Sequence, residues 1–293
     1  VSVYERYYYG GISMMAILRT VTIRDLVKMD TLMQAKRKFR RRGTYEQAII
    51  SKLDHVIGRT GWDRSHTRVI NPDIQYHFCN ENLRPEFYQA RWDPEKIEKF
   101  SIFLSQGAYP IKGIHMMIKA LQIVIKYYPE ARVYIGGKNN NGVSTLAGKL
   151  KKKGYDKYVY RLINTSGLKD QVIFTGPLDA AEMADRFCRS HLFVCPSSIE
   201  NSPNSLGEAQ LVGTPAIASF VGGVPDMITD GESALLYRME EYEMLAFRIM
   251  EVFGNDQLAR KLSENGRREA RVRHDWEENA RRMLEIYEGI IHS

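Results

Sequence analysis

The sequence predicts an α/β protein of two lobes, the second of which holds a parallel sheet with helices on both faces. After residue 100, short apolar runs alternate with segments whose apolar residues recur at helical spacing. Several of the apolar runs end in glycine, and 293 residues are enough for two separate cores. Strand–helix repeats of this kind are typical of a doubly wound parallel sheet.

The elements of the second lobe follow in order along the chain. The expected strands are 100–106, 131–137, 171–176, 191–197 and 214–223, and the expected helices are 113–128, 144–154, 180–190, 205–213, 256–274 and 275–293. Ligands of such sheets bind beyond the carboxyl ends of the strands. We therefore expect one binding rim, formed by the loops that follow Gln106, Gly136, Thr175, Ser197 and Val221.

The first lobe is less complete in the sequence. Residues 12–42 predict helix, 46–60 predict a helix followed by the short strand 55–58, and 71–88 are rich in loop residues. With one clear strand in about 100 residues, we expect only the later part of a lobe. The chain begins with Val1 and has no signal-peptide pattern, so we expect an N-terminal piece to precede it.

Composition excludes several classes of protein. Hydrophobic residues make up 44% and charged residues 26%, which argues against disorder, and no apolar run reaches the length of about 18 residues that a membrane span needs. Cys79, Cys188 and Cys195 are scattered and form no Cys-x-x-Cys pair. We interpret them as reduced thiols of a cytoplasmic protein.

Positive charge is concentrated in one segment. The net charge is +7, and residues 36–42 carry six cations, Lys36, Arg37, Lys38, Arg40, Arg41 and Arg42. Such a segment binds anionic lipid headgroups or acidic substrates. The alternative is a solvated helix face, and the sequence leaves both open. Because no nucleic-acid-binding motif accompanies it, we do not expect a nucleic-acid partner.

Two glutamates, Glu200 and Glu208, flank a loop of small residues before a predicted helix. Ser205 and Glu208 have the Ser-x-x-Glu spacing of a capping box, which is a purely structural alternative. A helix start also binds anions through its free N–H groups, and small residues let a diphosphate approach. Since a carboxylate repels phosphate, both glutamates are expected to accept hydrogen bonds from hydroxyls. This pattern predicts a ligand with hydroxyls on both sides of a diphosphate, such as a nucleotide sugar.

Other residues of the rim fit the same ligand. Lys112 follows the first strand of the second lobe and is expected to face the diphosphate, although a surface lysine without a role is an equal alternative. Gly222 and Gly223 permit close approach by a sugar or form an ordinary turn. There is no Asp-x-Asp, so we expect no metal, and His77 with Cys79 lacks the further ligands that a metal site needs. Nucleotide-binding glycine and phosphate-loop fingerprints are also absent from the sequence.

Residues 101–236 resemble the C-terminal, donor-binding lobe of the GT-B retaining glycosyltransferases of family 4, also called group 1 glycosyltransferases. The hallmark of that family, two glutamates separated by seven residues, stands here as Glu200 and Glu208, followed by Ala209. CPSSIE precedes it, VGTPAIAS and GGVPDMITDGESALLY follow it, and AYPIKGIHMMIKAL resembles the family's Lys-Gly helix start.

The resemblance implies roles for individual residues. Glu200 and Lys112 would be the catalytic pair, with Glu200 beside the hydroxyls of the transferred sugar and Lys112 on the diphosphate. Glu208 would bond the ribose. The donor-binding residues implied in this way are Glu208, Asn204, Ser205, Leu206, Gly107, Gly176 and Gly223.

The resemblance also implies an organisation and an activity. A partial acceptor lobe would span 1–99, the donor lobe 100–274, and a helix crossing back to the first lobe 275–293. The activity would be transfer of a sugar from a nucleotide diphosphate sugar with retention, without cofactor or metal. The acceptor would be a saccharide or a lipid-linked molecule at the inner membrane face, in cell-surface polysaccharide or glycolipid synthesis. A GT-B sugar-nucleotide epimerase and a non-catalytic nucleotide-sugar-binding subunit are the alternatives.

The sequence departs from the family pattern at several places. Ala108 follows Gly107 where the family often has arginine, Ala234 replaces a usual glycine, and Asp226 stands where glutamate is frequent. The early glycine-rich loop of the family has no counterpart in residues 1–99. We therefore expect donor binding to survive in this chain and turnover to be weak.

Overall fold

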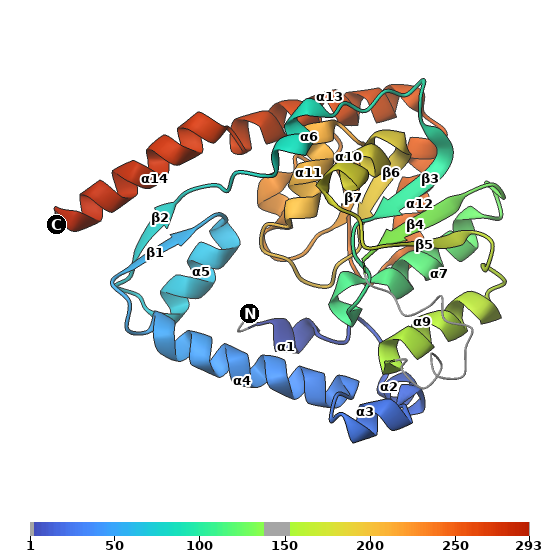
Figure 1. Cartoon of the computed structure of the whole chain (residues 1–293), viewed down its shortest axis with the longest axis horizontal. Coiled ribbons are helices and arrows are strands. Elements are labelled where there is room, and N and C mark those ends of the chain that lie inside the picture. The colour runs from blue at the N-terminus through green and yellow to red at the C-terminus, as the bar shows by residue number, and fades with distance from the viewer. Residues whose placement is uncertain (1–2, 138–152, 293) are drawn as a thin grey trace.

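A six-stranded parallel sheet forms the centre of the larger lobe (Figure 1). The computed structural model describes residues 3–137 and 153–292. The strand order is β5-β4-β3-β6-β7-β8, and every pair in it is parallel. The strands are β3 (Glu98–Leu104), β4 (Arg132–Gly136), β5 (Val172–Gly176), β6 (Ser190–Cys195), β7 (Ala216–Ser219) and β8 (Leu235–Tyr237). The doubly wound α/β architecture predicted from the sequence is confirmed.

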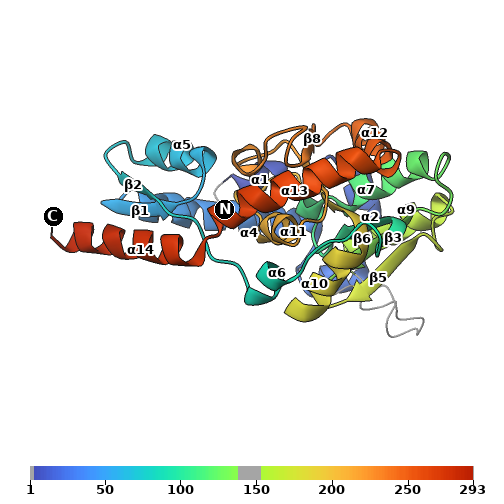
Figure 2. The same cartoon turned by 90° about the horizontal axis from the view of Figure 1, so that it is seen from above.

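Helices cover both faces of this sheet (Figure 2). α7 (Ile114–Val124) and α12 (Tyr242–Phe253) pack together on one face, while α10 (Ala180–Arg189) and α11 (Asn204–Val212) lie on the other with the short α6 (Pro85–Gln89). α13 (Asp256–Arg273) packs against α11. Because both faces are covered, every residue of β6 and β7 is buried, which explains why these strands appear in the sequence as continuous apolar runs.

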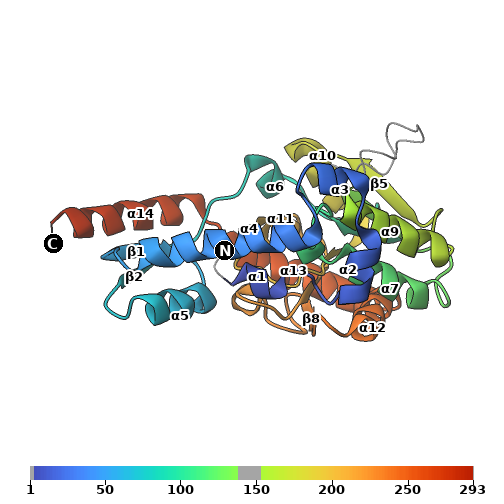
Figure 3. The same ribbon diagram turned by 90° about the horizontal axis from the view of Figure 1, so that it is seen from below.

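The smaller lobe contains a two-stranded parallel sheet and several helices (Figure 3). Its elements are α1 (Tyr4–Tyr7), α2 (Met14–Thr20), α3 (Ile23–Val27), α4 (Leu32–Ile50), β1 (His55–Gly58), α5 (Gly61–Ile70) and β2 (Gln75–Phe78). α14 (Trp276–Ile291) extends from the larger lobe to this sheet, where the Arg282 guanidinium Nε donates to the carbonyl of Phe78 at 3.4 Å.

The structure corrects some sequence predictions in the smaller lobe. The predicted helix 12–42 is three helices, because Thr22 and Thr31 each form a capping box that starts a new one. α4 continues past the predicted end at residue 42 to Ile50. Gly43, which could have ended the helix, is buried within it. Strand 55–58 is confirmed. β2 lies in a stretch that was predicted as loop; its four residues do not alternate between buried and exposed, so they lack the usual pattern of a strand.

The larger lobe also holds elements that the sequence did not reveal. Most of the predicted helix 144–154 lies outside the described residues, and Gly154 begins α9 (Gly154–Thr165) where it was predicted to end a helix. β8 and α12 were not predicted. Within the ranges that the structure describes, no helix is long and apolar enough to span a bilayer.

Candidate functional site: a cavity at the carboxyl edge of the sheet

A cavity of about 590 Å³ lies at the carboxyl ends of β3, β4, β5 and β6, and we call it the carboxyl-edge cavity. Four of the five loops expected on the rim contribute to it: residues 104–106, Gly137, 177–178 and the long loop after β6. The loop after Val221 does not. The predicted site residues on its wall are Lys112, Glu200, Asn204, Ser205 and Glu208.

Lys112 and Glu200 form a short ion pair in this cavity. A single 3-10 turn, Pro110–Lys112, places the lysine just before α7, and its Nζ lies 2.6 Å from Glu200 Oε1. The Ser197 hydroxyl donates to the same oxygen at 2.8 Å. Burial would lower the pKa of Lys112, but the Glu200 carboxylate raises it above the ordinary value, so the lysine is held charged. Glu200 Oε2 makes no hydrogen bond to the residues described, which leaves it available to a ligand hydroxyl.

Helix α11 points its first turn into the same cavity. It begins at Asn204, with Pro203 at the N-cap and no side-chain cap. The capping box suggested by Ser205 and Glu208 is therefore wrong: Ser205 lies inside the helix, and Glu208 is turned toward another partner. The backbone N–H of Leu206 donates to the Pro203 carbonyl at 3.0 Å. Those of Asn204 and Ser205 have no acceptor in the part of the chain that the structure describes, so they remain available to an anion.

Glu208 is paired with an arginine that sequence reasoning missed. Arg84 donates to Glu208 Oε1 from Nη2 at 2.9 Å and from Nε at 3.2 Å. Burial raises the pKa of the Glu208 carboxyl, and the guanidinium offsets part of that effect. Both bonds reach one oxygen, so Oε2 has no protein donor within the described ranges. Arg84 also stacks on Phe87, with its guanidinium carbon 4.7 Å from the ring centroid. No local pattern marked this arginine.

The three predicted glycines lie near the cavity but not on its wall. A Cβ on Gly107 would lie 1.9 Å from Ile114 Cδ1, so this glycine lets α7 pack closely. Gly176 has φ +81°, a conformation that favours glycine, and precedes the lining residue Pro177. A Cβ on Gly223 would lie 2.4 Å from the Asn201 carbonyl oxygen. Their role toward a donor stays a prediction.

The turn between β1 and α5 joins the smaller lobe to the Glu200 loop. The Thr60 hydroxyl donates to Asn201 Oδ1 at 2.6 Å, and Asn201 Nδ2 donates to Asp63 Oδ2 at 2.8 Å. Asp226, one of the departures from the family pattern, accepts the N–H of Gly61 at 2.6 Å. Two loops of the larger lobe thus hold the start of α5, and the lobes meet beside the catalytic candidate Glu200.

The segment around α1 packs behind the Lys112–Glu200 pair. Tyr8, Ile111 and Ile199 form a small buried apolar cluster, and the Ser198 hydroxyl donates to the Tyr7 carbonyl at 2.8 Å. His115 Nε2 donates to the Gly10 carbonyl at 2.6 Å, and burial lowers the pKa of this imidazole to about 4, so it is neutral at physiological pH. The segment therefore supports, from behind, the two stretches of chain that carry Lys112 and Glu200.

In the described chain, His77 lies beside His55, and His77 and Cys79 are not joined by the further side chains that a metal site needs. His77 Nε2 lies 3.0 Å from His55 Nδ1, so one imidazole donates to the other. Among the described residues, no group of three or more His, Cys, Asp or Glu side chains is placed to hold a metal ion.

The family model for glycosyl transferases group 1 matches residues 87–269. This chain belongs to the group 1 glycosyltransferases. The match begins just after Arg84 and includes every residue of the carboxyl-edge cavity that lies in the larger lobe. Membership of the group 1 glycosyltransferases, which the sequence predicted, is thereby confirmed.

Curated relatives of this glycosyltransferase are similar over most of its length. It is 27% identical over 244 residues to mannosylfructose-phosphate synthase of Agrobacterium fabrum, covering 81% of this chain and 51% of that protein. It is 27% identical over 189 residues to D-inositol 3-phosphate glycosyltransferase of Streptomyces coelicolor, covering 63% of this chain and 39% of that protein. The chain thus spans about half the length of the curated relatives it matches.

Solved structures of low sequence identity share its fold. Sucrose-phosphate synthase from Thermosynechococcus elongatus superposes with a TM-score of 0.70 at 22% identity, covering 84% of this chain and 61% of that one. Anabaena HepE in complex with UDP-glucose has a TM-score of 0.70 at 18% identity, and the likeness covers 84% of this chain and 66% of that one. The GT-B architecture expected from the resemblance is confirmed by these likenesses.

Proposed function

We propose that this chain binds a nucleotide diphosphate sugar in the carboxyl-edge cavity and transfers the sugar, with retention and without a metal, to a saccharide or lipid-linked acceptor. The observation that carries the proposal is that Glu200, Glu208, Lys112 and the free amides of α11 line one cavity. Cell-surface polysaccharide or glycolipid synthesis on the cytoplasmic side of a membrane is the proposed setting. Related proteins named as glycosyltransferases and a relative in fold that holds UDP-glucose support this choice of donor.

The charges in the cavity suit the parts of such a donor. The diphosphate fits against the amides of Asn204 and Ser205 and the ammonium of Lys112, which supply positive potential to the leaving group as the bond to the anomeric carbon breaks. The unoccupied oxygens of Glu200 and Glu208 accept from hydroxyls of the sugar and the ribose. Retention means that the acceptor oxygen bonds to the face from which the diphosphate departs.

Thermal unfolding with UDP, GDP, ADP and their sugar conjugates tests donor binding. A ligand at about 100 times its dissociation constant stabilises the folded state by about 2.7 kcal/mol, which shifts the midpoint visibly. We expect one base to shift the wild type and Glu208→Ala to lose most of that shift. Glu130→Ala, which removes an exposed carboxylate elsewhere, is the control and should keep it. If no nucleotide shifts the wild type, the donor site is refuted.

We also propose that the smaller lobe contacts anionic membrane through α2, α3 and α4. Five of the six cations of segment 36–42 are exposed, while Lys36 is partly committed to Glu5 and to the Tyr9 ring. Beside them, α2, α3 and the turn after α3 expose seven large apolar side chains: Met14, Met15, Leu18, Ile23, Leu26, Val27 and Met29. Peripheral membrane proteins typically bind anionic headgroups with cations and insert neighbouring apolar side chains into the membrane–water interface. Figure 3 shows these helices next to one another.

Sedimentation with vesicles tests this contact. We expect the wild type to sediment with vesicles that contain phosphatidylserine and to remain in solution with phosphatidylcholine alone. Charge reversal of Arg37, Arg40 and Arg41 should abolish sedimentation. A charge-reversed chain that still sediments fully would remove the electrostatic part of the proposal.

A further inference from the structure

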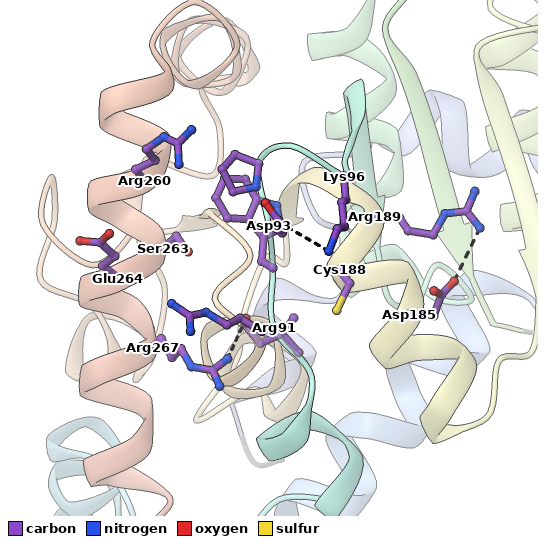
Figure 4. Close-up of a pocket in the computed structure, with 13 residues that line it drawn as sticks. Arg91, Asp93, Lys96, Asp185, Cys188, Arg189, Arg260, Ser263, Glu264 and Arg267 are labelled. Carbon is purple, nitrogen blue, oxygen red and sulfur yellow. Dashed lines mark hydrogen bonds and ion pairs between the residues drawn. The ribbon is translucent and has the colours of Figure 1, made fainter.

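A second cavity, of about 670 Å³, lies at the opposite edge of the large sheet, and we call it the amino-edge cavity. Its wall contains residues 91–94 and Lys96, which precede β3, the end of α10, which precedes β6, and one side of α13. None of its lining residues lines the carboxyl-edge cavity. Figure 4 shows its side chains.

Most charged groups around this cavity are paired. Its wall holds five cations, Arg91, Lys96, Arg189, Arg260 and Arg267, and three acids, Asp93, Asp185 and Glu264. Lys96 pairs with Asp93 at 3.3 Å, Arg189 with Glu98 at 2.5 Å, and Arg260 with Glu95 at 2.8 Å. Two arginines, Arg91 and Arg267, are left without a carboxylate among the described residues.

Arg267 is anchored to the backbone with part of its guanidinium free. Its Nη1 donates to the carbonyls of Ala90, Leu211 and Val212 at 2.8, 2.8 and 3.0 Å, which fixes the group at the end of α11. Nε and Nη2 have no acceptor in the ranges that the structure describes. Burial, Arg271 and Arg91 each lower the pKa of Arg267, so the site places two like charges together without compensation.

Arg91 lies beside Arg267 and has no hydrogen-bond acceptor of its own in the described chain. In Figure 4 the two guanidinium groups lie next to each other at the centre of the cavity, whereas Glu264 points away from them. Trp92, the next residue, is fixed by an N–H donated to Val212 at 2.9 Å and an indole N–H donated to Ser190 at 2.8 Å. The backbone that carries Arg91 is therefore held in place by its neighbour.

We propose that the amino-edge cavity binds a small phosphorylated anion, with its phosphate between Arg91 and Arg267. Guanidinium groups bind phosphate through paired N–H donors, and phosphate would neutralise the two charges that the protein leaves uncompensated. The Ser263 hydroxyl faces the same space and makes no hydrogen bond within the part described, so it offers one more donor. Small-molecule sites commonly have volumes of about 300–1,000 Å³, which leaves room for a sugar or polyol beyond the phosphate.

Cys188 supplies a reporter that is specific to this cavity. It is a partly exposed free thiol on the cavity wall, while Cys79 and Cys195 are buried. Burial raises the pKa of Cys188, so iodoacetamide labelling is followed at pH 8.5, with mass spectrometry of the peptide. The probes are inorganic phosphate and glucose 6-phosphate, added separately. A probe at about ten times its dissociation constant leaves about a tenth of the cavities empty, so labelling of Cys188 should slow about tenfold.

Two variants make the experiment specific. Arg91→Gln removes an exposed side chain with no structural bond, and it should abolish the protection by both probes. Arg161→Gln removes an exposed arginine of α9 that does not line the amino-edge cavity, and this variant should keep the protection by both probes. UDP, the probe for the carboxyl-edge cavity, should not protect Cys188, so a failed donor site and a failed anion site give different results.

Each outcome decides the proposal. Protection by both probes indicates that phosphate alone is recognised, and protection by glucose 6-phosphate alone indicates that the sugar also contributes. Protection that persists in Arg91→Gln places the ligand elsewhere and overturns the site. No protection by either probe at 10 mM, confirmed by calorimetric titration of the wild type, also overturns it.

Discussion

The two cavities lie at opposite edges of one parallel sheet and hold charge in opposite ways. At the carboxyl edge, Lys112 and Arg84 each bind a buried carboxylate on a single oxygen. At the amino edge, Arg91 and Arg267 lie together, and no carboxylate in the described chain pairs with either. The first arrangement neutralises the protein's own charges, while the second leaves positive charge for a ligand to neutralise.

This difference indicates what each edge recognises. A carboxylate that is paired on one oxygen keeps the other for a neutral hydroxyl, so the carboxyl edge suits a ligand rich in hydroxyls. Lys112 and the start of α11 supply its attraction for anions, while Arg84 is paired with Glu208. The amino edge offers unpaired guanidinium groups and suits a compact anion. Residues of both edges lie within the family match, so the contrast concerns two sites of one lobe.

The largest expected effect comes from Lys112→Ala. The change leaves the buried Glu200 carboxylate without its counter-charge and removes a contact to the leaving group. We expect loss of about 2 kcal/mol of unfolding free energy, below the 3–5 typical of fully buried pairs because Lys112 is 29% exposed. We also expect loss of transfer by at least about a hundredfold. Urea unfolding and a transfer assay measure the two effects.

Matched variants separate charge from packing. Arg91→Gln should leave stability unchanged or slightly higher, since it relieves repulsion at the amino edge. The double change Lys112→Met with Glu200→Gln should recover most of the stability without recovering transfer. If Lys112→Ala and Arg91→Gln prove equally harmless, the electrostatic contrast between the edges does not exist.

The next effect is a loss of stability in acid, caused by a histidine that lies against Gly207 of α11. His274 is buried beneath α11, where its Nδ1 donates to the Glu81 carbonyl at 2.7 Å. Burial, with Arg273 and Arg59, lowers its pKa from 6.5 to about 3. As the pH falls, the unfolded chain binds a proton at this histidine before the folded chain does. The stability that depends on neutral His274 is therefore complete above pH 6.5 and is lost as the pH falls toward 3. The slope is about 1.4 kcal/mol per pH unit.

His274→Asn tests this assignment because asparagine offers an N–H donor and does not titrate. We expect the variant to flatten the fall in unfolding free energy between pH 6.5 and 5, measured by urea unfolding at each pH. His292→Asn, at an exposed position, should leave the slope unchanged. The other buried histidines, His115 and His191, retain part of the slope in both variants, since burial lowers the pKa of each to about 4. Equal slopes in all three chains would contradict the assignment.

The sequence revealed the larger lobe because its strands are buried on both faces. Continuous apolar runs such as β6 stand out without any alignment, and the rule that ligands bind at carboxyl ends then brings Lys112, Glu200 and Glu208 together. The same reasoning was wrong for the Ser205 capping box. A local Ser-x-x-Glu pattern cannot show that Pro203 already starts the helix or that Glu208 has a distant partner.

Contacts between remote segments account for most of what was missed. Arg84 meets Glu208 across 124 positions of sequence, and Arg267 meets Ala90 across 177. Neither pairing leaves a periodic or local signal, so neither the arginine at the carboxyl-edge cavity nor the amino-edge cavity was predictable. The smaller lobe was hard for a related reason: the four residues of β2 show no clear pattern of burial, and capping threonines divided one apparent helix into three.

The last expected effect concerns the junction of the lobes. A Cβ at position 223 would lie 2.4 Å from the Asn201 carbonyl oxygen and 2.7 Å from Thr60 Cγ2, so Gly223→Ala must move the Glu200 loop away from the β1–α5 turn. We expect a loss of about 1–3 kcal/mol of unfolding free energy, as for overpacking elsewhere, and a reduced nucleotide shift in thermal unfolding.

The control is Gly289→Ala, in α14 with nothing within 4 Å, which should stabilise the protein by about 0.5–1 kcal/mol. Because Thr60, Asn201 and Gly223 do not line the amino-edge cavity, phosphate protection of Cys188 should be unchanged in Gly223→Ala. Loss of both responses would mean that the two edges are coupled through the lobe junction, and that the contrast in their charges does not make them independent.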